Sequence, residues 1–393
     1  MRRAIPLLLV LLAASASAYS LFSLGRPGEP VTPADARGAA MGNTSLGLWD
    51  YYNYTLLNPA NIAGLEYSVL TLTTQREHNT YSIGAGESVY VSSGMPNIQL
   101  AVGFSGGWSV ALGWRERQSW RFRYTTDLDD PAGDGSVGTV DVEGRGAVNS
   151  ANLALAWAPN DDLGLGLRVS GIIGDPHERW TADYDENDYV STTDELGCEV
   201  RGLAVGAGAN LRFDSLTAGA YFEVPVLSDV TRITESGFGE VSRETTEFSY
   251  PINFGAGLGF RPQENLQLVG DARYEMWSGF SIGDDELGYD DALHLGLGLE
   301  YIPTRRYNAF FLWRMPLRLG GYYETLYDAP QGSGSLAEWG LTAGLGVFFG
   351  TDDQSTVDVA FQYAQRGSVE EAGLEETFLR LMFTFNGADK WFQ

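Results

Sequence analysis

The stretch "LALAWAPNDDLGLGLRVSG", Leu153 to Gly171, contains the pattern on which a prediction of the fold depends. Large apolar residues occupy every second position on both sides of a short turn at Pro159 to Asp162. The positions between them hold mostly Gly or Ala, with Arg168 in the second half. Because successive side chains of a strand point to opposite faces, this alternation predicts two antiparallel strands with one apolar face and one small or polar face.

The same pattern recurs along most of the chain. From Leu65 onward it predicts about 14 antiparallel strands, an even number as in bacterial outer-membrane barrels. The candidate strands are residues 65–76, 96–105, 107–124, 144–159, 162–178, 195–213, 215–232, 243–262, 264–280, 289–302, 306–321, 335–350, 354–368 and 374–386.

The connections between these strands alternate in length. Short turns are predicted at residues 105–107, 159–162, 213–215, 261–265, 302–306 and 350–354. Longer polar loops lie between them, for example at residues 127–143, 180–194 and 283–290. This alternation is typical of an all-β, up-and-down transmembrane barrel with short periplasmic turns and long outer loops. A soluble sandwich gives no reason for it.

The apolar face of these strands has no second layer of sequence to cover it, so we expect it to contact lipid. Aromatic residues on this face, beside the short turns, predict a girdle at the periplasmic rim. They are Phe104, Trp108, Trp157, Phe213, Phe260, Tyr301, Tyr307, Phe349 and Phe385.

The composition of the chain and its residues 1–18 indicate where the protein is located and which partners it lacks. The formal net charge of −26 argues against a nucleic-acid partner. The single Cys198 cannot form an internal disulfide. Residues 1–18 combine two arginines, an apolar run and the small-residue sequence Ala16-Ser17-Ala18, which predicts a cleaved signal peptide. The predicted location is therefore the cell outer membrane, among its lipid and lipopolysaccharide.

Residues 19–64 lack the strand pattern of the barrel, residues 65–393. A barrel of about 14 strands encloses a lumen too wide for side chains to fill. We therefore expect residues 19–64 to fold back as a hatch that plugs the lumen. A short helix is expected from Pro33, with Thr32 as its N-cap. Asn58, Pro59 and Ala60 are predicted to form the turn that joins hatch and barrel.

Two stretches of this segment, "ADARGAAMGNTSLGL" (Ala34 to Leu48) and "YNYTLLNPANIAGL" (Tyr52 to Leu65), carry a family resemblance. Together they resemble the hatch of FadL-like outer-membrane transporters, in which a segment containing Met-Gly precedes an Asn-Pro-Ala turn. Asn61 departs from that family, where many members have Gly. The residues from Phe361 to Phe392 are similar to FadL-like proteins of Bacteroidota-type bacteria.

The resemblance implies passive uptake of hydrophobic small molecules, such as long-chain fatty acids. The alternative is a FadL-like barrel that serves as a docking or assembly component of a protein secretion system. The expected partners are a hydrophobic ligand, the barrel assembly machinery that inserts the chain and, under the alternative, secretion-system proteins.

Two sets of residues are candidates for the lumen site. Apolar hatch residues are expected either to bind a hydrophobic ligand or to pack the hatch against the wall: Met41, Leu46, Leu48, Trp49, Leu56 and Leu57. Charged residues on the small or polar face are expected to tie down the hatch, hydrate a channel or hold a carboxylate head group. These are Arg115, Arg168, Asp271, Arg273, Glu275, Arg314, Arg318, Arg366 and Arg380.

Signals for catalysis are weak. No G-x-S-x-G motif occurs, and His78, His177 and His294 lack metal-ligand spacing. Glycine-rich patterns such as Gly255 to Gly259 lie inside strands without a following helix, so they do not predict a dinucleotide site. The sequence therefore predicts neither an enzyme nor a cofactor or metal site.

Overall fold

The computed structural model describes residues 20–391, apart from residues 24–25, 51, 84–85, 130–136, 185–189, 238, 240, 284, 287, 305–308, 328–335, 351–352 and 373. The predicted signal peptide, residues 1–18, lies outside the described residues. Within the described residues, no helix is both long enough and apolar enough to cross a membrane.

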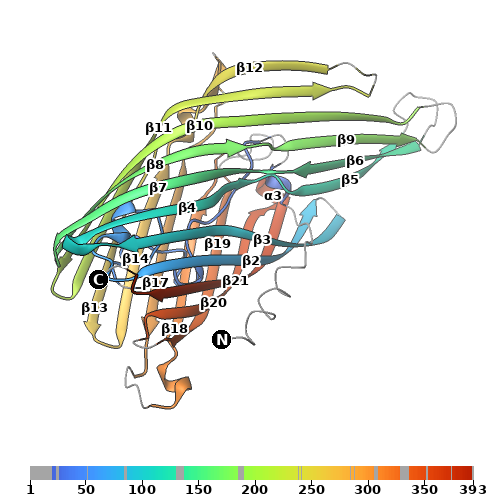
Figure 1. Cartoon of the computed structure of the whole chain (residues 1–393). Coiled ribbons are helices and arrows are strands. Elements are labelled where there is room, and N and C mark those ends of the chain that lie inside the picture. Colours follow the sequence, from blue (N-terminus) through green and yellow to red (C-terminus); the bar gives the residue numbers. More distant parts are fainter. Residues whose placement is uncertain are drawn as a thin grey trace.

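Fourteen antiparallel strands form a closed ring (Figure 1), so the predicted fold class and strand number are confirmed. In ring order they are β2 (Ser68–Ile83), β3 (Gly86–Gly103), β4 (Trp108–Ser119), β7 (Ala147–Asn160), β8 (Leu163–Gly174), β10 (Thr192–Phe213), β11 (Leu216–Glu235), β13 (Asn253–Gln263), β14 (Leu266–Glu275), β17 (Ala292–Tyr301), β18 (Leu317–Thr325), β19 (Ala337–Phe349), β20 (Ser355–Ser368) and β21 (Leu374–Asp389). Pairing of β2 with β21, from Ser68↔Asp389 to Ser82↔Glu375, closes the ring. Closure leaves no free edge in the wall.

The alternation within each strand sets which side chains face out. In β8, Leu167 is 64% exposed on the outer surface, whereas its neighbour Arg168 is only 2% exposed and faces the lumen. The outward apolar residues have no covering layer in the described structure, as expected for lipid contact.

The predicted aromatic girdle is confirmed for the residues that the structure describes. Seven of its members are exposed on the outer surface: Phe104, Trp108, Trp157, Phe213, Phe260, Tyr301 and Phe349. Neighbouring strands bring their rings together, with Trp108 and Trp157 stacked at a centroid distance of 5.5 Å. Phe385 is half-buried beside Phe349, and Tyr307 lies outside the described residues.

Most of the predicted short turns are confirmed, but the strand predicted at residues 306–321 is correct only from Leu317 onward. Its described first part contains a 3-10 helix, η5 (Phe311–Arg314), and β18 begins only at Leu317. The run from Phe310 to Trp313 is continuously apolar, so it cannot present a small or polar face to the lumen. Hydrogen bonds from Thr304 N–H to the Trp313 carbonyl (3.0 Å) and from Trp313 N–H to the Phe310 carbonyl (2.9 Å) shape this connection.

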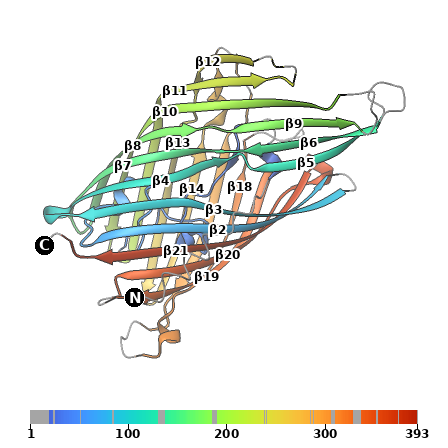
Figure 2. The ribbon, with the colours of Figure 1, turned by 45° about the vertical axis from the view of Figure 1, so that its right-hand side comes forward.

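Two of the regions predicted as long outer loops, residues 127–143 and 180–194, contain strands. The sheet extends beyond the ring through β5 (Phe122–Asp129), β6 (Val137–Arg145), β9 (His177–Tyr184) and β12 (Val241–Ser249) (Figure 2). Of these, β12 lies almost wholly in the strand predicted at residues 243–262. Cross-strand polar pairs support them, such as Arg123 with Asp141 at 2.9 Å and Thr231 with Thr245 at 2.9 Å. Phe122 of β5 and Val142 of β6 also pack together in a buried cluster with Tyr81.

Short elements complete the chain. The N-terminal segment, which we define as residues 20–65, contains η1 (Leu21–Ser23), β1 (Glu29–Pro30), α2 (Ala36–Ala39) and η2 (Pro59–Ile62). The others are η3 (Ser105–Gly107), η4 (Trp277–Gly279), β15 (Ser281–Ile282), β16 (Asp285–Glu286) and α3 (Val369–Ala372). The predicted N-cap of the helix is wrong: Asp35, not Thr32, caps α2 by accepting a 2.8 Å hydrogen bond from Gly38 N–H.

Candidate functional site

The N-terminal segment lies against the inner face of the wall, where glycines allow its backbone to approach closely. A Cβ atom at Gly298 on β17 would collide with the Met41 backbone, and one at Gly219 on β11 would collide with the Leu46 carbonyl. Any larger side chain at these positions would displace the segment. The small residues on the inward face of the strands therefore allow residues 36–63 to pack closely against the wall.

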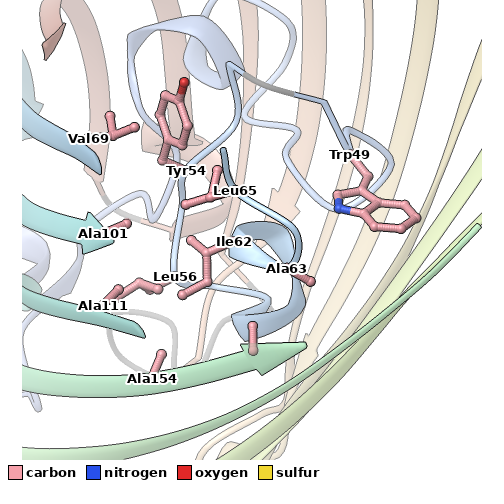
Figure 3. Close-up of a cluster of buried hydrophobic side chains, with 11 residues drawn as sticks. Trp49, Tyr54, Leu56, Ile62, Ala63, Leu65, Val69, Ala101, Ala111 and Ala154 are labelled. Carbon is pink, nitrogen blue, oxygen red and sulfur yellow. The ribbon is translucent and has the colours of Figure 1, made fainter. Parts of the chain in front are cut away.

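The six apolar candidates from this segment are all buried, but they do not form one pocket. Met41 and Leu48 pack on Val269 of β14, and Leu46 and Leu57 pack on Tyr221 of β11. Trp49 and Leu56 belong to a third cluster with Ile62, Leu65 and wall alanines, in which Trp49 lies apart from the other labelled side chains (Figure 3). Each pair fills space between segment and wall.

The predicted joint forms a hydrogen-bonded turn over β8 and β10. The Asn58 side chain caps η2 by accepting a 2.9 Å hydrogen bond from Ala60 N–H. Its amide also donates to Asn210 Oδ1 at 2.9 Å, and Asn210 in turn donates to Asn61 Oδ1 at 3.1 Å. Pro59 occupies the first position of η2, where its fixed φ suits a helix start. Asn61, the residue that departs from the family pattern, is thus bonded to the wall.

Three of the predicted lumen charges hold the segment directly or through one partner. Asp271 accepts hydrogen bonds from the backbone N–H groups of Ser45 (2.5 Å), Leu46 (2.7 Å) and Gly47 (3.0 Å). Arg168 donates to the carbonyls of Leu56 and Leu57. Arg318 donates to Glu300 at 2.7 Å, and the same carboxylate accepts from Arg37 of α2 at 3.0 Å.

Arg366 and Arg380 form a second group, at the start of the segment. Arg366 contacts Glu338 at 2.6 Å, Glu29 at 2.7 Å and Glu376 at 3.0 Å. Arg380 also reaches Glu338, at 3.2 Å. Each carboxylate here faces at least one guanidinium, so the buried charges compensate one another.

The remaining predicted charges have different surroundings. Glu275 accepts a 2.9 Å hydrogen bond from the Trp277 indole. Arg314 is not on a strand: it lies on η5 and pairs with Asp353 of the β19–β20 connection. Arg115 on β4 and Arg273 on β14 form no ion pair and no side-chain hydrogen bond with any described residue.

The titration of two carboxyls in the segment reflects the same packing. Burial raises the pKa of Asp35 to about 6, although the Gly38 N–H bond opposes this shift. Burial also acts on Asp50, but the Arg37 guanidinium outweighs it and holds the pKa of Asp50 well below its usual range. Both oxygens of Asp50 accept from Arg37, at 2.7 and 2.8 Å.

A cavity of about 920 Å³ lies at the end of the barrel away from the short turns. Its lining includes the aromatic residues Trp120, Phe248, Tyr250, Phe280 and Tyr289. None of the six apolar candidates contributes to it. Sequence reasoning missed these residues because they come from several predicted strands, and no local pattern shows that their side chains meet.

In the described part of the chain, no group of three or more His, Cys, Asp or Glu side chains is placed to hold a metal ion.

Comparisons with known proteins agree with this architecture. The family model described as BamG matches residues 9–393. No curated protein matches the chain.

Solved structures with a similar fold include a FadL homologue of Pseudomonas aeruginosa, with 12% identity, a TM-score of 0.66, and coverage of 92% of this chain and 99% of that one. The Ralstonia pickettii toluene transporter TbuX has 13% identity, a TM-score of 0.62, and coverage of 90% and 98%. The P. putida toluene transporter TodX has 14% identity, a TM-score of 0.58, and coverage of 92% and 99%. The fold is thus that of FadL-like barrels.

Proposed function

The chain belongs to the BamG family, and we propose that it is an outer-membrane barrel that binds hydrophobic small molecules and takes them up passively. Long-chain fatty acids and small aromatic hydrocarbons are the compounds to test first. In this proposal the chain is exported by a signal peptide at residues 1–18, and its wall contacts outer-membrane lipid and lipopolysaccharide.

The observation that carries the proposal is the cavity of about 920 Å³ at the outer end. Ligand pockets for small molecules commonly enclose about 300–1,000 Å³ and are lined mainly by apolar and aromatic side chains. Five aromatic residues line this cavity, and Val148 and Val200 add aliphatic surface. An apolar molecule entering from outside would lose contact with water there.

Residues 19–64 act as the hatch in this proposal, and residues 65–393 as the barrel. The hatch is held by the Asp271 carboxylate and by the Arg37–Glu300 pair, contacts that must loosen for a ligand to pass. The apolar residues from Met41 to Leu57 then have a sealing role. Pro251 lies between β12 and β13, where the pairing of β11 passes from one strand to the other, and it lines a smaller cavity of about 50 Å³.

Uptake tests the proposal. Cells that lack the protein should take up radiolabelled toluene and oleate more slowly than cells that express it. Val230→Trp on β11 fills the cavity and should slow uptake several-fold, whereas Leu227→Trp, which faces outward on the same strand, should have no effect. Equal uptake by the two variants would remove the cavity from the mechanism.

A second function is favoured by a different observation. The name of the family points to the barrel assembly machinery, and the lumen around Arg366 is crossed by buried ion pairs rather than an apolar path. A barrel of this kind would serve as a docking or assembly component for other outer-membrane or secreted proteins.

Partner capture separates the two functions. Cross-linking in intact cells followed by purification should recover assembly or secretion proteins if the barrel is a docking component, and its depletion should lower the amounts of other barrels. A transporter should instead co-purify with apolar small molecules and leave those amounts unchanged.

A further inference from the structure

We propose that Arg115 and Arg273 form a binding site for a small oxyanion, a carboxylate or a phosphate group, beneath the outer cavity. The inference deepens the proposed function, because it names a charged group that a ligand of this lumen would carry. It rests on the surroundings of two arginines and on the cavity that they share.

The arginines of the lumen fall into two classes. Arg37, Arg318 and Arg366 each contact carboxylates at 3.0 Å or less. Arg273 is only 8% exposed, yet its Nε has no hydrogen-bond partner, and no ion pair joins it to any described carboxylate. Arg115 likewise has no ion-pair partner among the residues that the structure describes. A buried cation without an ion pair is costly, and a bound anion would compensate it.

Both arginines line one cavity of about 50 Å³ between the N-terminal segment and the wall. A water-sized group needs about 10–15 Å³ by this measure, so the cavity has room for an oxyanion head group. The hydroxyl-bearing Tyr221 and the amide-bearing Asn253 also line it. Arg273 additionally borders the polar cavity of about 110 Å³ near Arg366.

The charges around the cavity leave a positive balance. Arg117 also lines it, but Glu223 neutralises that guanidinium at 2.6 Å and is shared with Arg168. Among the described residues that line this cavity, Glu275 is the one carboxylate. Arg115 and Arg273 thus line this cavity without an ion pair to any described carboxylate. Asp271, Glu275 and Glu324 act on Arg273 only at longer range. Guanidinium groups bind carboxylate and phosphate through paired, charge-assisted hydrogen bonds.

The position of the cavity suggests how an anion would reach it. Gln118 and Tyr250 line both this cavity and the outer cavity of about 920 Å³, and they are joined by a 3.0 Å hydrogen bond. An oxyanion attached to an apolar body would place its body among the aromatic residues and its charge on Arg115 and Arg273. A free anion would use the inner cavity alone.

Calorimetric titration of the full-length protein in a non-ionic detergent tests the site. The probes are inorganic phosphate, acetate, decanoate, decyl phosphate and uncharged decanol. At least one oxyanion should bind, and Arg273→Gln should weaken that binding at least tenfold. Arg115→Gln is the second variant, in case the first does not fold, and heat-modifiable gel mobility reports folding. Arg243→Gln, which removes an exposed arginine of β12, is the matched control and should bind like the parent.

Comparison of the five probes distinguishes a free anion from the head group of an amphiphile. Tighter binding of decanoate or decyl phosphate than of acetate or phosphate indicates the head group of an amphiphile, and equal binding indicates a free anion. Both outcomes support the site. Absence of oxyanion binding to the parent, or equal binding by the parent and both variants, overturns it. Uptake of toluene, which carries no charge, is measured in parallel, so failure of the proposed function and failure of the anion site give separate results.

Discussion

Arg366 on β20 and Arg273 on β14 occupy the same inner face of one barrel, but their surroundings differ. Arg366 is enclosed by Glu29, Glu338 and Glu376, whereas Arg273 has no carboxylate within ion-pair distance among the described residues. The first arrangement fastens the start of the N-terminal segment to the wall. The second leaves a guanidinium without an ion pair beside a cavity. Buried charges in one lumen thus serve two purposes, which can be separated by experiment.

The largest expected effect comes from removing a paired arginine. Arg366→Met leaves three buried carboxylates with less compensation and should destabilise the barrel by about 3–5 kcal/mol. Arg273→Met removes an unpaired cation and should be neutral or stabilising in the absence of ligand. Thermal melting followed by heat-modifiable gel mobility measures both. Similar losses for the two variants would show that Arg273 has a structural partner.

A smaller effect is expected at the glycines that let the N-terminal segment pack closely against the wall. Gly298→Ala introduces a Cβ against the Met41 backbone and should weaken docking of the N-terminal segment by about 1–3 kcal/mol. Pore conductance in planar bilayers should therefore rise. Gly171→Ala on β8 is the control, because its Cβ would meet only the Ala151 carbonyl at 3.9 Å. An unchanged conductance of Gly298→Ala would show that the segment does not block the pore.

The carboxylate of Asp271 offers a milder test of the same docking. Asp271→Asn keeps one acceptor oxygen but loses the charge that strengthens three backbone hydrogen bonds, at an expected cost of about 1–2 kcal/mol. Limited proteolysis of the segment in the folded barrel measures the change. Asp141→Asn, in the outer sheet, should leave the cleavage rate as it is in the parent.

The smallest expected effect is a pH dependence. The pKa of Asp35 is raised to about 6 in the folded protein, so the docked segment binds a proton more tightly than the undocked one. Its docking should therefore be stronger at pH 5 than at pH 7, by about 1 kcal/mol. Asp35→Asn keeps the cap of α2 and should flatten this dependence of the proteolysis rate. A parent rate that falls as pH rises would contradict the sign.

The barrel could be predicted from the sequence because the same short pattern of residues recurs in almost every strand. Each strand such as β8 carries its own apolar and small faces, and each short turn lies beside an aromatic residue such as Trp157. The prediction placed a strand at residues 306–321 that begins only at Leu317, because the apolar run before it has no alternation and forms η5. It also missed β6 and most of β5 and β9, which lie in regions predicted as outer loops.

The candidate site was less accessible to sequence reasoning. The alternation along each strand predicts that Arg115, Arg273 and Arg366 all face the lumen. It does not predict which of them forms ion pairs. Their partners are distant in sequence, as with Arg37 and Glu300, which are 263 residues apart. Which arginine meets a carboxylate depends on strand register around the ring and on the path of the N-terminal segment.

The sequence alone determined a closed wall of 14 strands with a lipid face and an aromatic girdle, because bilayer contact imposes one rule on every strand. It also marked residues 19–64 as different from that wall. Only the tertiary structure decided that glycines such as Gly298 seat this segment, that aromatic residues gather around the outer cavity, and that Arg115 and Arg273 are left unpaired. Those features depend on distances between residues on different strands, and no local pattern encodes such distances.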